Sequence, residues 1–290
     1  MTEQPSLTVD GLSIPLLGFG TWELEPADAR RMVAEALRIG YRHIDTAWIY
    51  RNEAAVGDGI RDAIEAGHVT RDEVWLTTKI WVAHFGHDAL LAQAKESAES
   101  LGFTPDLLLL HWPKPEPSFA ETLGALNEAK DQGLTRSIGL SNFPSAQFRE
   151  AQSLSKAKLV TNQVEYHPYL ANPSLLATAT DLGSSITAWS PLAQGKVAQD
   201  PVLIEIGRAH GKTPGQVTLR WQVQQGVATI PRTRNPARLA ENFVRQFGFH
   251  LQEAVVVGRV EEADRQARHL RDSGDDVLFL DDVALAELGG

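Results

Sequence analysis

Residues 41–57, YRHIDTAWIYRNEAAVG, hold the pattern that decides the fold. The apolar run His43–Asp45 predicts a short strand, and a loop over residues 46–51 follows it. A helix is then predicted to begin at Asn52, a residue type that often caps helix N-termini, with apolar side chains recurring along one face. A short strand followed directly by an amphipathic helix is the repeating unit of parallel α/β folds.

The same unit recurs along the chain. Short apolar runs between helical patterns predict eight strands, at residues 16–20, 43–45, 74–79, 107–111, 137–141, 161–165, 185–189 and 227–230. Eight such units without a change of composition favour an α/β protein with a closed (β/α)8 TIM barrel. Asp10-Gly11, between two apolar runs, predicts an N-terminal β-hairpin ahead of the barrel.

The competing fold is an open doubly wound sheet. That fold usually carries G-x-G-x-x-G after an early strand, and residues 18–23, GFGTWE, lack the third glycine. The glycines at 18 and 20 are equally well explained by a tight turn. The sequence therefore favours the closed barrel over the open sheet.

Composition limits the kinds of protein that the chain can be. Its 290 residues are 43% hydrophobic and 22% charged, which is ordinary for a globular protein. A formal net charge of −10 argues against nucleic acid as the main partner, because phosphate binding needs a basic surface. The absence of cysteine excludes disulfides, thiolate nucleophiles and cysteine metal sites, and it fits a reducing compartment.

The sequence gives no sign of export or of membrane insertion. Residues 1–18 lack the basic start and long apolar stretch of a secretory signal. No run approaches the roughly 18 apolar residues that a membrane-spanning helix needs. We therefore expect a soluble cytoplasmic protein without a membrane partner.

Four chemically suited side chains fall at or just after the carboxyl ends of predicted strands, where the active sites of such barrels lie: Asp45, Tyr50, Lys79 and His111. A phenol has an unperturbed pKa of about 10, and a nearby ammonium makes it a stronger acid. Lys79 can supply that charge and Asp45 can hold Lys79 in place. Tyr50 can then donate a proton to a substrate oxygen that His111 orients.

Each of these residues alone has a simpler structural explanation, since a single histidine at a strand end usually only satisfies packing. The set at one mouth is what points to catalysis. His84 and His87 lie three residues apart in a loop or at a helix start, and we expect no metal site. Further polar residues accompany the later strands: Ser141 and Asn142 after the fifth, Gln163 in the sixth, and Trp189 and Ser190 after the seventh.

Eight segments, in this order, carry a family pattern: GFGTW, YRHIDTAWIYRNEAAVG, LTTKIW, DLLLLHWP, SIGLSNF, TNQVEYHPYL, AWSPLAQGK and IPRTRNPARLAENF. Together they resemble the aldo-keto reductase superfamily over residues 16–243, and most of all its bacterial 2,5-diketo-D-gluconate and methylglyoxal reductases. The resemblance implies the barrel fold and NADPH-dependent reduction of small aldehydes and ketones, such as 2,5-diketo-D-gluconate and methylglyoxal-like dicarbonyls, to alcohols. It places the family's catalytic tetrad on Asp45, Tyr50, Lys79 and His111.

The resemblance also implies that NADP(H) binds across the barrel mouth without a Rossmann domain. The cofactor-binding residues that it implies are Thr21, Trp22, Ser141, Asn142, Gln163, Trp189, Ser190, Leu192, Gln194, Arg232, Thr233, Arg238, Glu241 and Asn242. In this assignment Ser141, Asn142 and Gln163 hold the nicotinamide carboxamide, and Trp189 stacks on the ring. The pyrophosphate follows Ser190, Leu192 and Gln194, and the adenine lies at Glu241 and Asn242.

The 2′-phosphate of the cofactor is assigned to Arg232, Thr233 and Arg238. Guanidinium groups suit phosphate, and the predicted helix N-terminus at Asn235-Pro236 adds a favourable dipole. Arg232 and Arg234 could instead be solvated surface charges, but their position beside a proline-bounded strand end favours the phosphate site. The sequence therefore predicts a preference for NADPH over NADH.

An aromatic rim is expected to bind the substrate. The substrate-binding residues are Trp22, Trp48, Trp81, His111 and Trp112. Some of these tryptophans could instead pack between helices. Trp48 lies so close to Tyr50 in the sequence that we expect it to influence substrate choice.

The C-terminal part departs from the family pattern. We predict two regions: the aldo-keto reductase barrel at 1–243, and an atypical acidic segment at 244–290 packed on or beside it. The alternatives for this segment are that it is poorly ordered or that it mediates self-association. We expect a monomer whose partner is a small carbonyl substrate. The alternative function is an NADP-binding regulatory or sensor protein of the same fold with little turnover.

Overall fold

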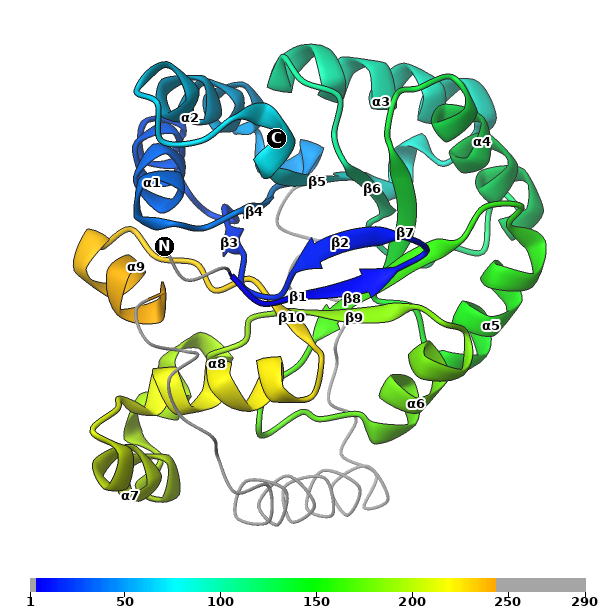
Figure 1. Cartoon of the computed structure of the whole chain (residues 1–290). Helices are drawn as coiled ribbons and strands as arrows, with labels where there is room; N and C mark the ends of the chain where they lie inside the picture. Colours follow the sequence, from blue (N-terminus) through cyan, green and yellow to red (C-terminus); the bar gives the residue numbers. More distant parts are fainter. Residues whose placement is uncertain (1–3, 244–290) are drawn as a thin grey trace, which may run out of the picture.

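Eight parallel strands surround a common axis in this computed structural model, which describes residues 4–243 (Figure 1). They follow one another in the order β10-β9-β8-β7-β6-β5-β4-β3. The ring closes because Leu17 bridges in parallel to Thr229, whose N–H donates to the Leu16 carbonyl at 2.8 Å. The predicted (β/α)8 barrel is thus confirmed, and the open doubly wound sheet is excluded.

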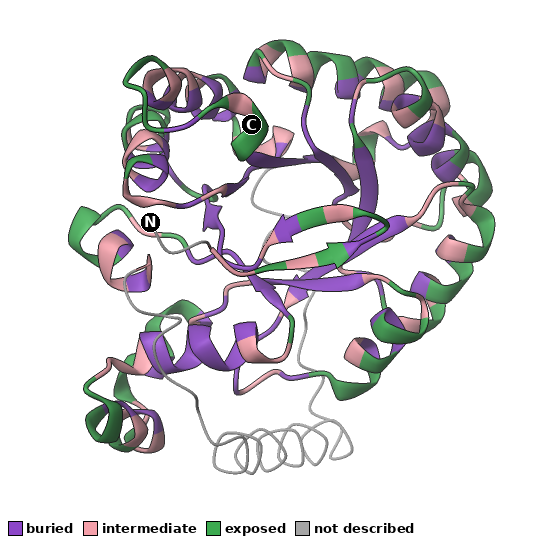
Figure 2. Cartoon of the chain, in the orientation of Figure 1, coloured by how far each residue is buried: buried purple, intermediate pink, exposed green. Residues whose placement is uncertain are grey.

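The strands of the barrel are short. They are β3 (Phe19–Gly20), β4 (His43–Asp45), β5 (Trp75–Ile80), β6 (Leu107–Leu110), β7 (Ser137–Ser141), β8 (Leu159–Glu165), β9 (Ser185–Trp189) and β10 (Ala228–Thr229). Every residue of β6 is buried, as expected for a strand that is covered on both faces. Figure 2 shows the buried strands inside and the exposed surfaces on the outer sides of the helices.

Helices cover the outside of the barrel (Figure 1). They are α1 (Pro26–Ile39), α2 (Glu53–Glu65), α3 (His87–Leu101), α4 (Phe119–Asp131), α5 (Ser145–Leu154), α6 (Pro173–Asp181), α7 (Pro201–His210), α8 (Pro214–Gln224) and α9 (Pro236–Phe243). Local signals set their ends. Proline occupies the first turn of α1, α6, α7 and α8, where its missing N–H costs no helical hydrogen bond. Thr213 and Gln216 form a capping box at the start of α8.

The predicted hairpin is present, with β1 (Ser6–Val9) paired to β2 (Leu12–Pro15). Asp10 and Gly11 make the turn with φ of 52° and 75°, the left-handed conformation that a two-residue hairpin turn requires. Val9 and Ile14 pack against side chains of β5, β6 and β8, and the hairpin lies across one end of the barrel (Figure 1). It covers the end at which these strands begin, so the opposite end remains for a site.

The strand and helix around Asp45 form as predicted, but Asn52 acts differently from the prediction. It precedes α2, yet its side chain makes no capping hydrogen bond. Its Nδ2 donates instead to the carbonyls of Thr21 and Leu24, at 2.9 and 3.0 Å, and its Oδ1 accepts from Thr46. Asn52 therefore fastens the turn after β3 to the loop after β4. The predicted acidic segment at 244–290 lies outside the described residues.

Candidate active site

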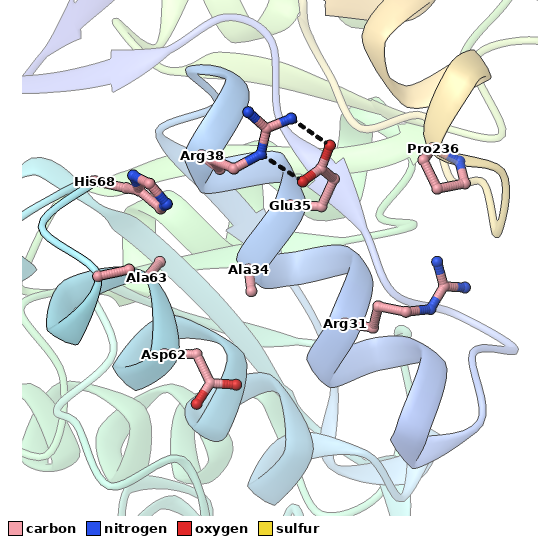
Figure 3. A pocket seen from close by; sticks show the side chains of 9 residues that line it. Arg31, Ala34, Glu35, Arg38, Asp62, Ala63, His68 and Pro236 are labelled. Atoms are coloured by element: carbon pink, nitrogen blue, oxygen red, sulfur yellow. Dashed lines mark hydrogen bonds and ion pairs between the residues drawn. The ribbon is translucent and has the colours of Figure 1, made fainter.

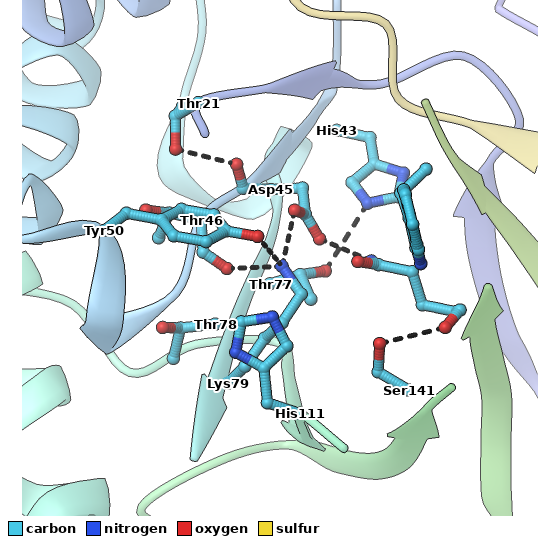
Figure 4. A network of polar contacts seen from close by, with 12 residues as sticks. Thr21, His43, Asp45, Thr46, Tyr50, Thr77, Thr78, Lys79, His111 and Ser141 are labelled. Carbon is cyan, nitrogen blue, oxygen red and sulfur yellow. Dashed lines mark hydrogen bonds and ion pairs between the residues drawn. The ribbon is translucent and has the colours of Figure 1, made fainter. Parts of the chain in front are cut away.

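Four predicted residues meet at the carboxyl-terminal end of the barrel (Figure 4). Asp45 ends β4, Lys79 lies one residue before the end of β5, and His111 directly follows β6. Tyr50 ends a single 3₁₀ turn, η1 (Trp48–Tyr50), in the segment that was predicted as a loop. Because parallel strands end at the same edge, side chains far apart in the sequence face one another here.

Lys79 is the centre of this group. Its side chain is 0% exposed, and its Nζ donates to Asp45 Oδ1 at 2.7 Å and to the Thr46 carbonyl at 2.8 Å. The third contact of Nζ is the Tyr50 hydroxyl at 3.5 Å. A buried ammonium is stable only when its charge and its three donors have partners. The arrangement fixes the ammonium beside the phenol.

Burial and charge act in opposite directions on Tyr50. Burial raises the pKa of the phenol, the Lys79 ammonium lowers it, and the net result lies above the ordinary value. Burial alone would lower the pKa of Lys79, but Asp45 and Tyr50 outweigh it and hold that pKa above its ordinary value. Lys79 thus acts on the Tyr50 pKa in the direction expected from the sequence, but burial, which no sequence pattern shows, outweighs it. Tyr50 therefore carries its proton at neutral pH.

His111 lies against Tyr50 as an uncharged ring. Their ring centroids are 5.8 Å apart at an interplanar angle of 71°. Burial, reinforced by the Lys79 charge, holds the pKa of His111 well below its ordinary value. Its Nδ1 is buried and has no hydrogen-bond partner within residues 4–243. A neutral imidazole with one N–H can donate a hydrogen bond to a substrate oxygen without adding charge.

Acid is expected to destabilise the protein through His111. Between its lowered folded pKa and the unfolded value of about 6.5, only the unfolded chain binds the extra proton, so stability falls as pH falls. We expect His111→Gln to reduce this loss by up to about 1.4 kcal/mol per pH unit below about pH 6.5. Urea unfolding across this range measures the difference.

Wild type and His111→Gln contain the same other titrating groups. The contributions of those groups to the pH dependence of stability therefore cancel when the two proteins are compared. His43 is also buried with a lowered pKa, and burial raises the pKa of Glu53. His68→Gln, which replaces a histidine on the surface, is the control. Equal slopes for wild type and His111→Gln would contradict the expectation.

Asp45 uses its second carboxylate oxygen for a partner on the opposite wall. Gln163 Nε2 donates to Asp45 Oδ2 at 2.6 Å. Gln163 lies on β8, four places from β4 in the ring of eight strands, so this bond crosses the barrel interior. The sequence assigned Gln163 only to the cofactor and missed this contact. The available signal was an amide side chain near the carboxyl end of a predicted strand.

Ser141 and Asn142 extend the network toward His111 and Trp189. Ser141 Oγ donates to the Gln163 carbonyl at 2.9 Å, and Asn142 Nδ2 donates to the His111 carbonyl at 3.0 Å. Trp189 Nε1 donates to Asn142 Oδ1 at 2.9 Å. Asn142 has φ of 67°, a left-handed conformation that asparagine tolerates well. The structure therefore groups the residues predicted to hold the nicotinamide beside the four central residues.

Of the predicted aromatic rim, Trp81 lies next to the site. Its ring centroid is 5.4 Å from that of His111, in an edge-to-face arrangement. Its backbone N–H donates to Gln93 Oε1 at 3.2 Å, so α3 holds the start of the loop after β5. Trp112 follows His111 and is half-buried. For Trp81 and Trp112, binding of the substrate remains a prediction.

The other two tryptophans of the rim have cationic neighbours. The Trp48 ring lies 4.3 Å from the Arg51 guanidinium and packs against the His84 ring at 4.9 Å. Trp22 is 40% exposed, and the Arg232 guanidinium lies 5.7 Å from its ring centroid. Arginine over an indole face is a favourable cation–π contact. The arginine at Trp22 is one that the sequence assigned to phosphate.

Two segments carry most of the remaining residues that were predicted to bind the cofactor. The segment after β9, together with η4 (Ala193–Gln199), contains Ser190, Leu192 and Gln194. The segment after β10, together with α9, contains Arg232, Thr233, Arg238, Glu241 and Asn242. Glu241 Oε1 accepts from Thr213 Oγ1 at 2.7 Å, so α9 is tied to α8. Thr21 is buried beside the site and donates to the Asp45 carbonyl at 3.0 Å.

A hollow of about 490 Å³ lies elsewhere, on the outer face of α1 and α2 (Figure 3). Its charged side chains are already paired, Arg38 with Glu35 and Asp62 with Arg30. No predicted site residue lines it. In residues 4–243, no group of three or more potential metal ligands occurs. No helix in this described range is long and apolar enough to cross a bilayer.

Comparison with known sequences agrees with this geometry. A model of the aldo/keto reductase family matches residues 16–264. An aldo-keto reductase of Mycolicibacterium smegmatis is 41% identical over 265 residues, covering 90% of this chain and 95% of its own. Methylglyoxal reductase DkgB of Yersinia pestis is 41% identical over 239 residues, covering 81% of this chain and 88% of its own.

Solved structures give the same result. A crystal structure assigned as 2,5-diketo-D-gluconic acid reductase B superimposes with a TM-score of 0.85 at 46% identity, covering 89% of this chain and 91% of its own. An aldo-keto reductase of Bombyx mori in complex with NADP gives 0.83 at 33% identity, covering 90% and 93%. The chain therefore belongs to the aldo/keto reductase family and is an oxidoreductase.

Proposed function

We propose that this protein reduces small aldehydes and ketones to alcohols with NADPH, with 2,5-diketo-D-gluconate and methylglyoxal-like dicarbonyls as the substrate class. One observation carries the proposal: the buried Lys79 ammonium contacts both the Asp45 carboxylate, at 2.7 Å, and the Tyr50 hydroxyl, at 3.5 Å. An uncharged His111 lies beside the Tyr50 ring. The relatives named methylglyoxal reductase and 2,5-diketo-D-gluconic acid reductase support the choice of substrates.

The residues around the mouth suit NADPH. Ser141, Asn142 and Gln163 offer a hydroxyl and two amides beside the tetrad, and Trp189 offers a half-buried aromatic face. Exposed arginines beside α9 offer positive charge for a phosphate, which guanidinium groups bind well. When bound there, NADPH supplies the hydride for the carbonyl carbon.

The protein's own groups handle the proton. Tyr50, whose raised pKa keeps it protonated, donates its proton to the carbonyl oxygen as that oxygen gains negative charge. The Lys79 ammonium stabilises the phenolate that remains, and Asp45 keeps Lys79 charged and in place. His111 donates its N–H to the same oxygen and orients the carbonyl. The phenolate then recovers a proton from water, so the sum is one hydride and one proton added across the carbonyl.

Steady-state oxidation of NADPH with methylglyoxal, 2,5-diketo-D-gluconate and nitrobenzaldehyde tests the proposal. Turnover with at least one of these carbonyls, dependent on the enzyme, is the expected result. Tight NADPH binding without turnover of any of them would favour the alternative, a regulatory or sensor protein of the same fold. The intact set of four residues argues against that alternative.

Arg238→Ala is expected to reduce NADPH affinity selectively. Arg238 is exposed on the first turn of α9, where the helix N-terminus adds a favourable dipole for a phosphate. Losing a hydrogen bond to a charged group lowers affinity by about 10- to 100-fold. NADH lacks the 2′-phosphate, so its kcat/KM stays near the wild-type value.

The ratio of kcat/KM for NADPH over NADH is the measurement. Arg149→Ala on α5 is the matched control, since it removes an exposed arginine away from α9 and leaves the ratio unchanged. A wild-type ratio of one, or an equal loss for both cofactors in Arg238→Ala, would remove the argument for a phosphate site.

A further inference from the structure

Glu23 and Arg232 face each other across the seam at which the barrel closes. Glu23 lies three residues after β3 and Arg232 three residues after β10, and their side chains form an ion pair. Arg234 Nη2 donates to the Glu23 backbone carbonyl at 2.7 Å. One glutamate therefore holds both arginines of the segment after β10, one through its carboxylate and one through its backbone.

The backbone at Glu23 is set up for this contact. Its φ is 55°, in the left-handed region that residues other than glycine and asparagine rarely adopt. The turn that contains Glu23 is held in place, because Asn52 Nδ2 donates hydrogen bonds to the backbone carbonyls of Thr21 and Leu24 on either side of it. A glutamate in an unfavourable conformation, within a turn that is held in place, points to a role for its side chain.

The other acids near this seam do not take the place of Glu23. Asp28 pairs with Arg31 at 2.7 Å. Glu25 is exposed at the start of α1 and makes no ion pair within residues 4–243. The Arg232 guanidinium thus contacts both the Glu23 carboxylate and the Trp22 ring.

We infer that Glu23 is a specificity-determining residue that competes with the cofactor's 2′-phosphate for Arg232. The inference rests on the proposed function, in which Arg232 binds that phosphate. A guanidinium that holds a carboxylate must exchange it for the phosphate, and the released carboxylate then stands close to a second anion. Both effects weaken NADPH binding and leave NADH, which has no 2′-phosphate, largely unaffected. Glu23 therefore reduces the preference for NADPH that the arginines create.

The test is equilibrium titration of Glu23→Gln with NADPH and with NADH, followed by quenching of tryptophan fluorescence. Loss of the exposed ion pair and of the repulsion predicts NADPH affinity about three- to tenfold higher than in wild type, with NADH affinity unchanged. Glu25→Gln removes the same charge two residues away, and it leaves both affinities at their wild-type values. Raising the salt concentration narrows the difference between wild type and Glu23→Gln, because the pair is exposed.

Two further variants separate competition from a structural role. In an Arg232→Gln background, Glu23→Gln gives a smaller gain in NADPH affinity than in wild type, because no ion pair is left to exchange and only the repulsion remains. Glu23→Asn, which suits a positive φ, reproduces the gain if the charge is what matters. An unchanged NADPH affinity in Glu23→Gln, or an equal change for both cofactors, overturns the inference while the proposed function stands. A wild-type protein that binds neither cofactor overturns the proposed function itself.

Discussion

Tyr50→Phe is expected to lower carbonyl turnover by about 100- to 10,000-fold, the range that loss of a general acid causes. The substitution removes only the hydroxyl oxygen, which lies 3.5 Å from Lys79 Nζ. The aromatic ring stays in place beside His111. The substrate's carbonyl oxygen then has no proton donor positioned to protonate it. NADPH binding is retained, because the residues assigned to the cofactor are untouched.

Single-turnover rates with a saturating aldehyde measure the loss of carbonyl reduction. Titration with NADPH measures whether cofactor binding is retained. Tyr166→Phe is the matched control: it also deletes a phenolic oxygen, one that donates to Gln225 Oε1 at 2.8 Å. Its turnover stays close to wild type. Unimpaired turnover in Tyr50→Phe would defeat the assignment of the proton donor.

Lys79→Met is expected to cost both activity and about 3–5 kcal/mol of unfolding free energy, the typical loss when one partner of a buried ion pair is removed. Asp45 is 2% exposed, so its carboxylate would be left buried with its opposing charge gone. Gln163 alone would hold it, through the bond to Oδ2. The phenolate of Tyr50 would also lose the ammonium that stabilises it.

The double variant Asp45→Asn/Lys79→Met separates the two losses. Removing the stranded charge is expected to restore most of the stability, since the side-chain carbonyl of the introduced asparagine can still accept from Gln163. Activity does not return, because the ammonium is still missing. Urea unfolding and NADPH oxidation on the same samples give both quantities. A Lys79→Met protein that unfolds at the wild-type urea concentration would contradict the buried pair.

Local patterns predicted the fold well where strands are regular. Three strands, His43–Asp45, Ser137–Ser141 and Ser185–Trp189, were predicted with the bounds that the structure has. Their apolar runs are short and bounded by turn or helix signals, which makes periodicity informative. The first and last strands are shorter than predicted, because pairing at the seam passes through single bridges and loop hydrogen bonds rather than a long ladder.

Local sequence patterns could not predict contacts between segments that are far apart in the chain. Asn52 has the residue type of a helix cap, and only the position of the turn after β3 shows why it bonds there instead. The Gln163–Asp45 bond and the Glu23–Arg232 pair join residues 118 and 209 positions apart, and no local periodicity encodes such pairs. The net pKa of Tyr50 depends on burial, which needs the packed structure.

The Asp45 carboxylate joins the proton-donating side of the site to the wall assigned to the cofactor. One oxygen steadies the ammonium behind the proton donor, and the other anchors an amide on the wall assigned to the nicotinamide. A substitution chosen to retune hydride delivery on β8 therefore also disturbs acid strength on the opposite wall. Redesign for a new reductant or substrate must adjust both walls together, because one side chain couples them.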